Sequence, residues 1–326
     1  MDALRGERVL VTGAPGFIGS HLTRRLVALG AEVHALTPDV SSVFPLRLAA
    51  MRDRIILHEG NLADRGAMEA LAEAARPRRV FHLAAYTHVA KSWQRVDECI
   101  QSNIQGTVNL LQALERTSYE RFVYLGSSEI YGGIDVPFRE DAAVSPISPY
   151  SVAKYGGELF CRIYAQGRGW PIVMVRPFNA YGPAQSPDRV VPEIIVRALR
   201  GQPIKMTQGR QTRELNYVED LVDGLVLLGT ADGVDGELFN LGCGEEVSIR
   251  QLVATIDDIM GGAVKAEFGA LPDRPNEIWR MYSDSSKIRD RLGWKPTHTL
   301  EAGLRSTISW YETELARPDS PFAPSW

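Results

Sequence analysis

The sequence has 326 residues, of which 44% are hydrophobic and 23% charged, a composition typical of an ordinary globular protein of about two domains. It excludes disorder, collagen-like repeats and coiled coil, and the formal net charge of −4 offers no basic surface for nucleic acid. Three widely spaced cysteines without a CxxC pair, and six histidines without an HxH or HxxxH pair, argue against a disulfide framework and a metal site.

The chain carries no sign of a targeting or membrane segment. Its first residues lack the apolar region of a secretory signal, and no uncharged apolar run reaches about 18 residues. We therefore expect a soluble cytoplasmic protein with neither a membrane nor a nucleic acid as partner.

Short apolar strands alternate with helix-like stretches through the first half of the chain. A helix is predicted at 20–29, ending before Gly30. The predicted strands lie at 9–12, 33–37, 55–57, 80–85, 122–125 and 172–175. Because these strands are continuously apolar rather than alternating, they indicate a parallel sheet covered by helices on both faces. The predicted fold class is therefore α/β, with a doubly wound parallel sheet of the Rossmann type.

Proline- and glycine-rich turns break the second half into shorter pieces, which predicts a smaller α/β lobe. A strand is expected at 238–241 and a helix at 249–260, and the last residues, 316–326, contain three prolines and form a surface-packed or frayed tail. We expect a dinucleotide-binding Rossmann domain and a smaller substrate-binding lobe. Their residues are 1–176 with 211–242, and 177–210 with 243–326.

A glycine-rich turn lies between the first predicted strand and the first predicted helix. Its sequence, GAPGFIG at 13–19, allows the backbone to turn tightly and to approach a pyrophosphate closely. The N-terminus of the following helix offers free N–H groups and the positive end of the helix dipole. The turn is therefore predicted to bind a dinucleotide through Gly13, Gly16, Phe17, Ile18 and Gly19.

The sequence TGAPGFIGSHL around this turn resembles the fingerprint of the extended short-chain dehydrogenases/reductases, and in particular of the nucleotide-sugar epimerase/dehydratase family. The resemblance implies an NAD(P)-dependent enzyme whose substrate is a nucleotide-diphosphate sugar. It also implies a homodimer formed through the helix that bears Tyr150 and the loop and helix that precede it. The resemblance covers nearly the whole chain, and its further motifs are HLAA at 82–85, YSVAK at 150–154, RPFNAYGP at 176–183, RELNYVED at 213–220 and LGWKP at 292–296.

The cofactor is expected to be NAD, with NADP as the alternative. An acidic residue at the end of the second strand would bind the ribose hydroxyls of NAD, and this chain has Thr37 there, with Asp39 in reach to replace it. An NADP pocket would need an arginine for the 2′-phosphate, and Arg47 or Arg52 could reach into the pocket. The resemblance assigns further cofactor contacts to Asn61 and Leu62 beside the adenine, and to Leu83, Ala84 and Ala85 in the HLAA motif.

Tyr150 and Lys154 are four residues apart, so a helix places both on one face. A free tyrosine has a pKa of about 10, and the lysine cation together with a positive nicotinamide ring would stabilise the phenolate and lower this pKa. Ser127 follows the predicted strand 122–125, at the edge where doubly wound sheets bind ligands. The three residues are expected to carry hydride transfer: Tyr150 takes the hydroxyl proton while nicotinamide takes the hydride from the same carbon.

Glu129 and Ser128 bear on which reaction follows. In the resembling family, simple 4-epimerases usually lack a carboxylate at the position of Glu129, whereas 4,6-dehydratases, nucleotide-uronate decarboxylases and some 4-keto-6-deoxy sugar reductases have one. Oxidation at C4 acidifies the C5 hydrogen, and Glu129 is expected to be the base that removes it. dTDP-glucose dehydratases have an aspartate where this chain has Ser128, while GDP-mannose dehydratases and uronate decarboxylases share the serine.

The resemblance also predicts substrate contacts. Arginines suit a diphosphate because the guanidinium fork binds phosphate oxygens in pairs, and Arg213 and Arg274 match such positions. Arg280 matches a substrate arginine of the dehydratases, which decarboxylases tend to place one residue later, where this chain has Met281. His82, inside an apolar strand, is expected to be structural. The other predicted contacts are Asn179, Thr87, His88 and Lys91.

The leading hypothesis is an NDP-hexose 4,6-dehydratase that oxidises the sugar at C4, eliminates water and returns the hydride. The alternatives are a uronate decarboxylase, a 4-epimerase and a 4-keto-6-deoxy sugar reductase. Outside this class stands a non-catalytic NAD(P)-sensing protein, which would typically lack the tyrosine or the lysine that this chain retains.

Overall fold

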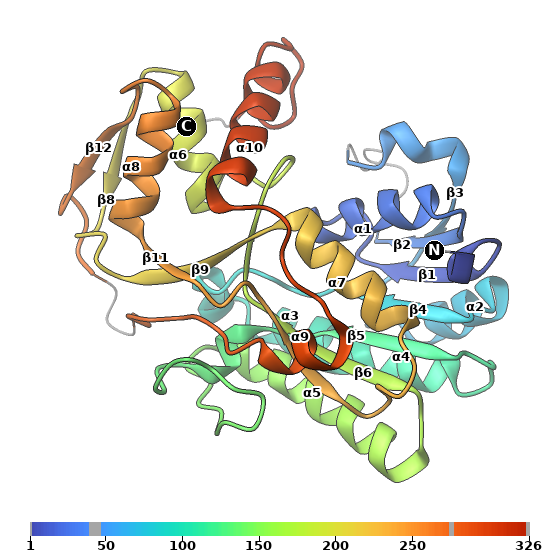
Figure 1. The fold of residues 1–326 in the computed structure, drawn as a ribbon. Coiled ribbons are helices and arrows are strands. Elements are labelled where there is room, and N and C mark those ends of the chain that lie inside the picture. The colour runs from blue at the N-terminus through green and yellow to red at the C-terminus, as the bar shows by residue number, and fades with distance from the viewer. Residues whose placement is uncertain (1, 39–46, 274–276, 324–326) are drawn as a thin grey trace.

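The computed structural model describes residues 2–38, 47–273 and 277–323. A sheet of seven parallel strands forms its centre, in the spatial order β10-β6-β5-β4-β1-β2-β3 (Figure 1). The chain order reverses between β1 and β4, and such a switch point is where doubly wound sheets bind ligands. The strands are β1 (Arg8–Thr12), β2 (Glu32–Thr37), β3 (Ile55–Glu59), β4 (Arg79–His82), β5 (Arg121–Leu125), β6 (Ile172–Pro177) and β10 (Leu238–Leu241).

Helices cover both faces of this sheet, as the continuously apolar strands predicted. On one face, α1 (Phe17–Ala28) and α7 (Val218–Thr230) bury their apolar side chains in one cluster with the strands. On the other face, α2 (Arg65–Ala75), α4 (Gly106–Leu114) and α5 (Pro149–Arg168) form a second cluster. The expected α/β fold with a doubly wound parallel sheet is therefore confirmed.

Helix α5 begins where the sequence supplies a capping box. The Ser148 hydroxyl accepts a hydrogen bond from the Ser151 N–H at 3.1 Å, and the Ser151 hydroxyl accepts one from the Ser148 N–H at 3.0 Å. Pro149 occupies the first helical position, where no intrahelical hydrogen bond needs its missing N–H. The helix ends at Gly169, whose φ of +65° suits a glycine. These signals place Tyr150 in the first turn.

The second half of the chain adds a smaller lobe, which stands to the left of the large sheet in Figure 1. A three-stranded sheet joins β7 (Asn179–Tyr181), β9 (Thr212–Tyr217) and β11 (Glu246–Ser248), with β9 in the middle. β8 (Pro203–Met206) and β12 (Lys265–Phe268) form a separate parallel pair. Three helices share one apolar cluster with these strands: α6 (Val190–Leu199), α8 (Ile249–Ile259) and α10 (Leu300–Leu315).

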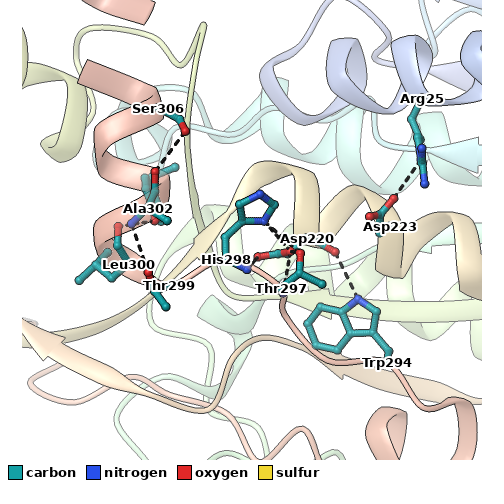
Figure 2. Close-up of polar contacts among 11 residues, drawn as sticks. Arg25, Asp220, Asp223, Trp294, Thr297, His298, Thr299, Leu300, Ala302 and Ser306 are labelled. Carbon is teal, nitrogen blue, oxygen red and sulfur yellow. Dashed lines mark hydrogen bonds and ion pairs between the residues drawn. The ribbon is translucent and has the colours of Figure 1, made fainter. Parts of the chain in front are cut away.

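Two of the family-like motifs, RELNYVED and LGWKP, meet at the start of α7. The Asp220 carboxylate accepts hydrogen bonds from the N–H and the hydroxyl of Thr297, at 3.0 and 2.7 Å, and from the N–H of His298 at 3.2 Å (Figure 2). The indole N–H of Trp294 donates to the carbonyl oxygen of Asp220 at 3.3 Å. These contacts attach the segment between α9 (Ser286–Leu292) and α10 to the large-sheet lobe.

Two predicted elements have different ends in the structure. The strand predicted at 80–85 ends at His82, because its neighbour β1 ends at Thr12 and the Thr12 hydroxyl takes the hydrogen bond of the Ala84 N–H. The helix predicted at 20–29 begins earlier, at Phe17.

Strand β9 belongs to the sheet of the smaller lobe, although it falls in the stretch 211–242 that we expected in the Rossmann domain. It pairs with β7 and β11, whereas α7 and β10, later in that stretch, belong to the layers of the large sheet. Phe322, in the expected tail, packs edge-on against Trp310 of α10, with ring centroids 4.9 Å apart. Across the described ranges, the helices are too short or too polar to cross a membrane.

Candidate active site

The glycine-rich turn leaves no room for side chains at two of its glycines. A Cβ atom on Gly13, which has a φ of +72°, would lie 2.6 Å from the backbone nitrogen of Ala84, and one on Gly19 would lie 2.0 Å from the Gly13 carbonyl oxygen. The Gly16 N–H donates to the Gly13 carbonyl at 2.9 Å, and α1 starts directly afterwards, at Phe17. This geometry fits a dinucleotide, because a pyrophosphate can approach the backbone N–H groups at a helix N-terminus.

The residues expected at the adenosine end lie after β2 and β3. Thr37 is buried at the last position of β2, Leu62 is buried as well, and Asp39 falls outside the described residues. The Asn61 side-chain oxygen accepts a hydrogen bond of 2.9 Å from a backbone N–H, which leaves its second lone pair for a ligand. Arg47, one of the two arginines considered for an NADP pocket, donates instead to two backbone carbonyls of the protein.

His82 is buried just before the loop 83–85, and its ring hydrogen-bonds two threonines, Thr12 and Thr107. Its Nδ1 lies 2.7 Å from the Thr12 hydroxyl, and its Nε2 lies 3.0 Å from the Thr107 hydroxyl. Thr12 also accepts from the Ala84 N–H at 3.2 Å, and Thr107 donates to the Asn103 carbonyl at 2.8 Å. Burial, with a smaller effect of the nearby lysine charge, lowers the pKa of His82 to about 3. The ring is therefore neutral and, as expected, structural.

The structure brings Ser127, Tyr150 and Lys154 together at the carboxyl end of β5. Ser127 hydrogen-bonds Tyr150, and the three residues are only 7, 8 and 4% exposed. The Lys154 Nζ donates to the Leu125 carbonyl at 2.5 Å, and the Tyr124 hydroxyl donates to the Lys154 carbonyl at 2.8 Å. Two hydrogen bonds thus attach α5 to the strand that positions the serine.

The pKa of Tyr150 in the chain alone is set mainly by burial. Burial raises it to about 12, the hydrogen bond with Ser127 opposes this rise, and the negative charge of Glu129 adds to it. Burial also lowers the pKa of Lys154, to about 8. In the chain alone the tyrosine pKa is raised, because loss of solvation outweighs the nearby charges. The positive nicotinamide ring that the expectation included would act in the lowering direction.

Glu129 and Ser128 lie in a short 3-10 turn directly after β5, where Glu129 is half-buried and Ser128 is buried. The Ser128 hydroxyl donates to the sulfur of Met281 at 3.7 Å, and the Asn179 amide donates to the same sulfur at 3.6 Å. A buried, neutral thioether therefore joins Ser128 to the predicted substrate contact Asn179. Sequence reasoning gave Met281 no such role, because the two residues in contact are 153 positions apart.

The predicted phosphate-binding arginines have partners within the chain. Arg213 forms an ion pair with Glu277 and donates to two backbone carbonyls, each at 2.7 Å. Arg280 forms an ion pair with Glu246 and keeps 56% of its side chain exposed. Arg274 falls outside the described residues. A diphosphate role for these arginines stays a prediction.

The loop after β4 presents Thr87 and Lys91 as exposed residues and His88 as a half-buried one. His88 Nε2 lies 3.3 Å from the carboxylate of Asp188, in the segment that precedes α6. The next residue, Arg189, was missed by sequence reasoning. Burial dominates the pKa of Tyr150, but the charge of Arg189 acts to lower it. No motif marks Arg189, and its electrostatic effect on the tyrosine arises from tertiary structure alone.

Comparison with known proteins extends the likeness to almost the whole chain. A family model described as GDP-mannose 4,6 dehydratase matches residues 10–307. A dTDP-glucose 4,6-dehydratase of Neisseria meningitidis serogroup B is 33% identical over 332 residues, which cover 94% of this chain and 93% of the relative.

Solved structures agree with this family. DesIV, a dTDP-glucose 4,6-dehydratase from Streptomyces venezuelae with NAD bound, matches with a TM-score of 0.87 at 29% identity, covering 95% of this chain and 98% of its own. A UDP-glucose 4-epimerase from Thermotoga maritima, in complex with UDP-glucose, matches with a TM-score of 0.88 at 31% identity, covering 94% and 99%. The chain therefore belongs to the GDP-mannose 4,6 dehydratase family, as its resemblance to nucleotide-sugar epimerases and dehydratases predicted.

Proposed function

We propose that this protein is an NAD-dependent NDP-hexose 4,6-dehydratase. It would oxidise the C4 hydroxyl of a nucleotide-activated hexose, eliminate water across C5 and C6, and return the hydride. The observation that carries the proposal is the Glu129 carboxylate beside the buried Ser127–Tyr150 pair. The Glu129 N–H donates to the Ser127 hydroxyl at 3.2 Å. After burial itself, the Glu129 charge is the main contribution that raises the Tyr150 pKa, so the carboxylate acts on the same site. Dehydration needs such a base, and simple epimerisation does not.

The glycine-rich turn supports NAD as the cofactor, because its tight backbone and helix N-terminus suit a pyrophosphate. The similar DesIV structure contains NAD. When bound, NAD supplies the acceptor for the hydride. The residues that would hold it are Gly13, Gly16, Phe17, Ile18 and Gly19 at the pyrophosphate, Thr37, Asn61 and Leu62 at the adenosine, and Leu83, Ala84 and Ala85 along the loop after β4.

Tyr150 and Ser127 would handle the C4 hydroxyl. The tyrosine oxygen takes the hydroxyl proton, and the serine holds both oxygens by hydrogen bonds. Because burial raises the Tyr150 pKa to about 12, the phenol is protonated in the chain alone. Deprotonation of this phenol is therefore coupled to ligand binding. The Lys154 ammonium, which donates to the Leu125 carbonyl at 2.5 Å, supports the phenolate that forms.

Glu129 and Ser128 would carry the elimination. Glu129 takes the acidic C5 proton, and the C5–C6 double bond forms as the C6–O bond breaks. The proton taken from C5 then joins the departing hydroxide, so that water leaves. Ser128 hydrogen-bonds the C6 oxygen. The partner of Ser128 in the structure is the neutral sulfur of Met281, which suits an uncharged C6 hydroxyl better than the carboxylate of a uronate. No cationic side chain in the described ranges hydrogen-bonds the Ser128 hydroxyl.

4-Epimerisation is the second candidate. The Thermotoga maritima UDP-glucose 4-epimerase matches this chain with a TM-score of 0.88. An epimerase would use Ser127, Tyr150 and Lys154 in the same way and return the hydride to the opposite face of C4. It would leave Glu129 without a chemical role.

We also propose a homodimer built on α3 (Val96–Ile100) and α5. Large apolar side chains with 39–60% of their surface exposed gather on these helices and on the turn before α3, and they are Trp93, Val96, Ile100, Val152, Leu159 and Ile163. On α5 they recur at intervals of seven and four residues and so form one stripe. α3 and α5 pack against each other, and an apolar surface of this kind marks a protein contact. A two-fold axis would pair the surface with itself.

The test is a mass measurement on nucleotide-activated hexoses and uronates incubated with the protein, without added reductant. Loss of water from one hexose supports the proposal. Loss of carbon dioxide from a uronate contradicts it in favour of a decarboxylase, and a new isomer of unchanged mass contradicts it in favour of an epimerase. A reaction that begins only when a 4-keto sugar and reduced cofactor are supplied would identify a reductase.

A further inference from the structure

Three consecutive backbone carbonyls after β7, at positions 183–185, each accept a hydrogen bond from a side chain far away in the sequence. His21 Nε2 lies 2.9 Å from the first carbonyl oxygen. Arg47 Nε donates to the second at 2.8 Å, and the Tyr311 hydroxyl donates to the third. We call residues 183–185 the brace.

The brace links the two lobes. It continues from β7 of the smaller lobe, and Tyr311 lies in α10 of that lobe, whereas His21 lies in α1 beside the large sheet. Arg47 reaches both sides, because its Nη1 also donates to the carbonyl of Pro15 at 3.3 Å. Pro15 is part of the glycine-rich turn. One guanidinium group therefore connects the turn to the brace.

Contacts on several sides hold the brace in one conformation. Ala184 has a φ of +62°, which residues other than glycine seldom adopt, and is buried. Such a backbone persists only where its surroundings fix it. The guanidinium of Arg47 also lies over the ring of Phe322, 5.3 Å from its centroid. Burial lowers the pKa of His21 to about 4, so the ring stays neutral and donates to its carbonyl partner through Nε2–H.

We infer that Arg47 is a positioning residue that slows the release of NAD. The inference rests on the proposed function, which assigns a dinucleotide to the glycine-rich turn. The proposed reaction removes and returns the same hydride, so the cofactor can remain bound over many turnovers. A turn that is fastened to the opposite lobe cannot move away from the cofactor independently. A lysine would replace Arg47 poorly, because two nitrogens of the planar guanidinium reach two separate carbonyls.

The experiment compares NAD release from the wild type, Arg47→Met, Arg47→Lys and the control Arg54→Met. Arg54 is an exposed arginine at the end of the neighbouring 3-10 helix Ala49–Arg54. Each protein is saturated with NAD, freed of excess by gel filtration, and sampled over time for protein-bound NAD. Arg47→Met is expected to release NAD roughly tenfold faster, the effect of losing a charge-assisted hydrogen bond, and Arg47→Lys to give an intermediate rate. Arg54→Met should match the wild type, and excess NAD should restore turnover to Arg47→Met.

Equal release rates for Arg47→Met and the wild type would overturn the inference. This holds even if Arg47→Met has a lower melting temperature, because Arg47 would then contribute to stability alone. A wild type that binds no NAD would contradict the proposed function and the inference together. A wild type that retains NAD beside a variant that loses it supports the inference and the dinucleotide site on which it rests. His21→Leu, which removes the donor to the first brace carbonyl, is expected to speed release as well, and it provides the test if Arg47→Met fails to fold.

Discussion

The ammonium group of Lys154 donates a hydrogen bond of 2.5 Å to the carbonyl oxygen of Leu125. The lysine of the YxxxK pair is thereby fixed to the strand end that carries Ser127, before any ligand is bound. Since the Tyr124 hydroxyl donates back to the Lys154 carbonyl at 2.8 Å, helix and strand are held together from both sides. The relative position of Ser127 and Tyr150 is therefore a property of the fold.

Tyr150→Phe removes the proposed proton acceptor and keeps the ring. Turnover of the nucleotide hexose is expected to fall at least about a hundredfold, the usual size of an acid–base contribution. Steady-state kinetics measure the loss, and thermal unfolding shows whether the fold persists. The matched control is Tyr155→Phe on the same helix, which should keep wild-type turnover. A Tyr150→Phe protein within a few fold of wild type would refute the assignment.

Glu129→Gln separates oxidation from elimination. The variant should still oxidise C4, because Ser127, Tyr150 and Lys154 are unchanged, but it should lack the base for the C5 proton. Reduced cofactor is then expected to accumulate, seen by its near-ultraviolet absorbance, while water loss slows about a hundredfold or more. Glu312→Gln, an exposed change on α10, serves as control. Water loss at the wild-type rate would show that another group is the base.

His82 makes the fold sensitive to acid. Its pKa is about 3 in the folded protein and about 6.5 in an unfolded chain, so between these values only the unfolded chain binds the proton. The stabilisation is complete above pH 6.5 and is lost as the pH falls towards 3. From pH 6.5 to 5 this residue should account for about 2 kcal/mol of lost unfolding free energy.

Denaturant titrations at both pH values test this for wild type and His82→Gln, and the variant should lose about 2 kcal/mol less over the interval. The neutral ring should also keep constant NMR shifts from pH 8 to 5. A His82 ring that titrates near pH 6.5 would be incompatible with its hydrogen bonds to Thr12 and Thr107.

Ile163→Glu should disrupt the proposed dimer. Ile163 is 57% exposed on the apolar stripe of α5, and a two-fold interface would bring two introduced carboxylates together. Light scattering after size exclusion is expected to show a dimer for the wild type and a monomer for the variant. Leu271→Glu is the control, because Leu271 is 45% exposed outside this surface. A monomeric wild type, or a variant that remains dimeric, would exclude this face as the interface.

Local spacing accounts for the parts of the site that the sequence could predict. The glycine-rich turn, the four-residue step from Tyr150 to Lys154 and the serine after β5 are each encoded within a few residues. The strand–helix alternation likewise predicted the large sheet, because the apolar strands and helix ends are local patterns. The small lobe was harder, since β9 takes its partners from β7 and β11, which are not its neighbours in the chain.

The remaining features depend on contacts between distant residues. Ser128 meets Met281 across 153 positions, and Arg47 meets Ala184 across 137. The raised pKa of Tyr150 arises mainly from burial, and the burial of a side chain cannot be read from the sequence. The carboxylate partners of Arg213 and Arg280 come from other loops and strands. No spacing rule links such pairs, because tertiary packing alone brings them together.

β10, the outermost strand beside β6, is synthesised after β7, α6, β8 and β9 of the small lobe. Until residues 238–241 emerge from the ribosome, one edge of β6 has no partner, and its side chains Ile172, Val173, Met174 and Val175 are those of a fully buried strand. The roughly 60 residues between these strands take on the order of 3 to 12 s to synthesise. Unpaired apolar edges readily join another chain. Nascent copies of this protein on one messenger RNA therefore face an aggregation hazard in that interval, which ends when β10 pairs with β6.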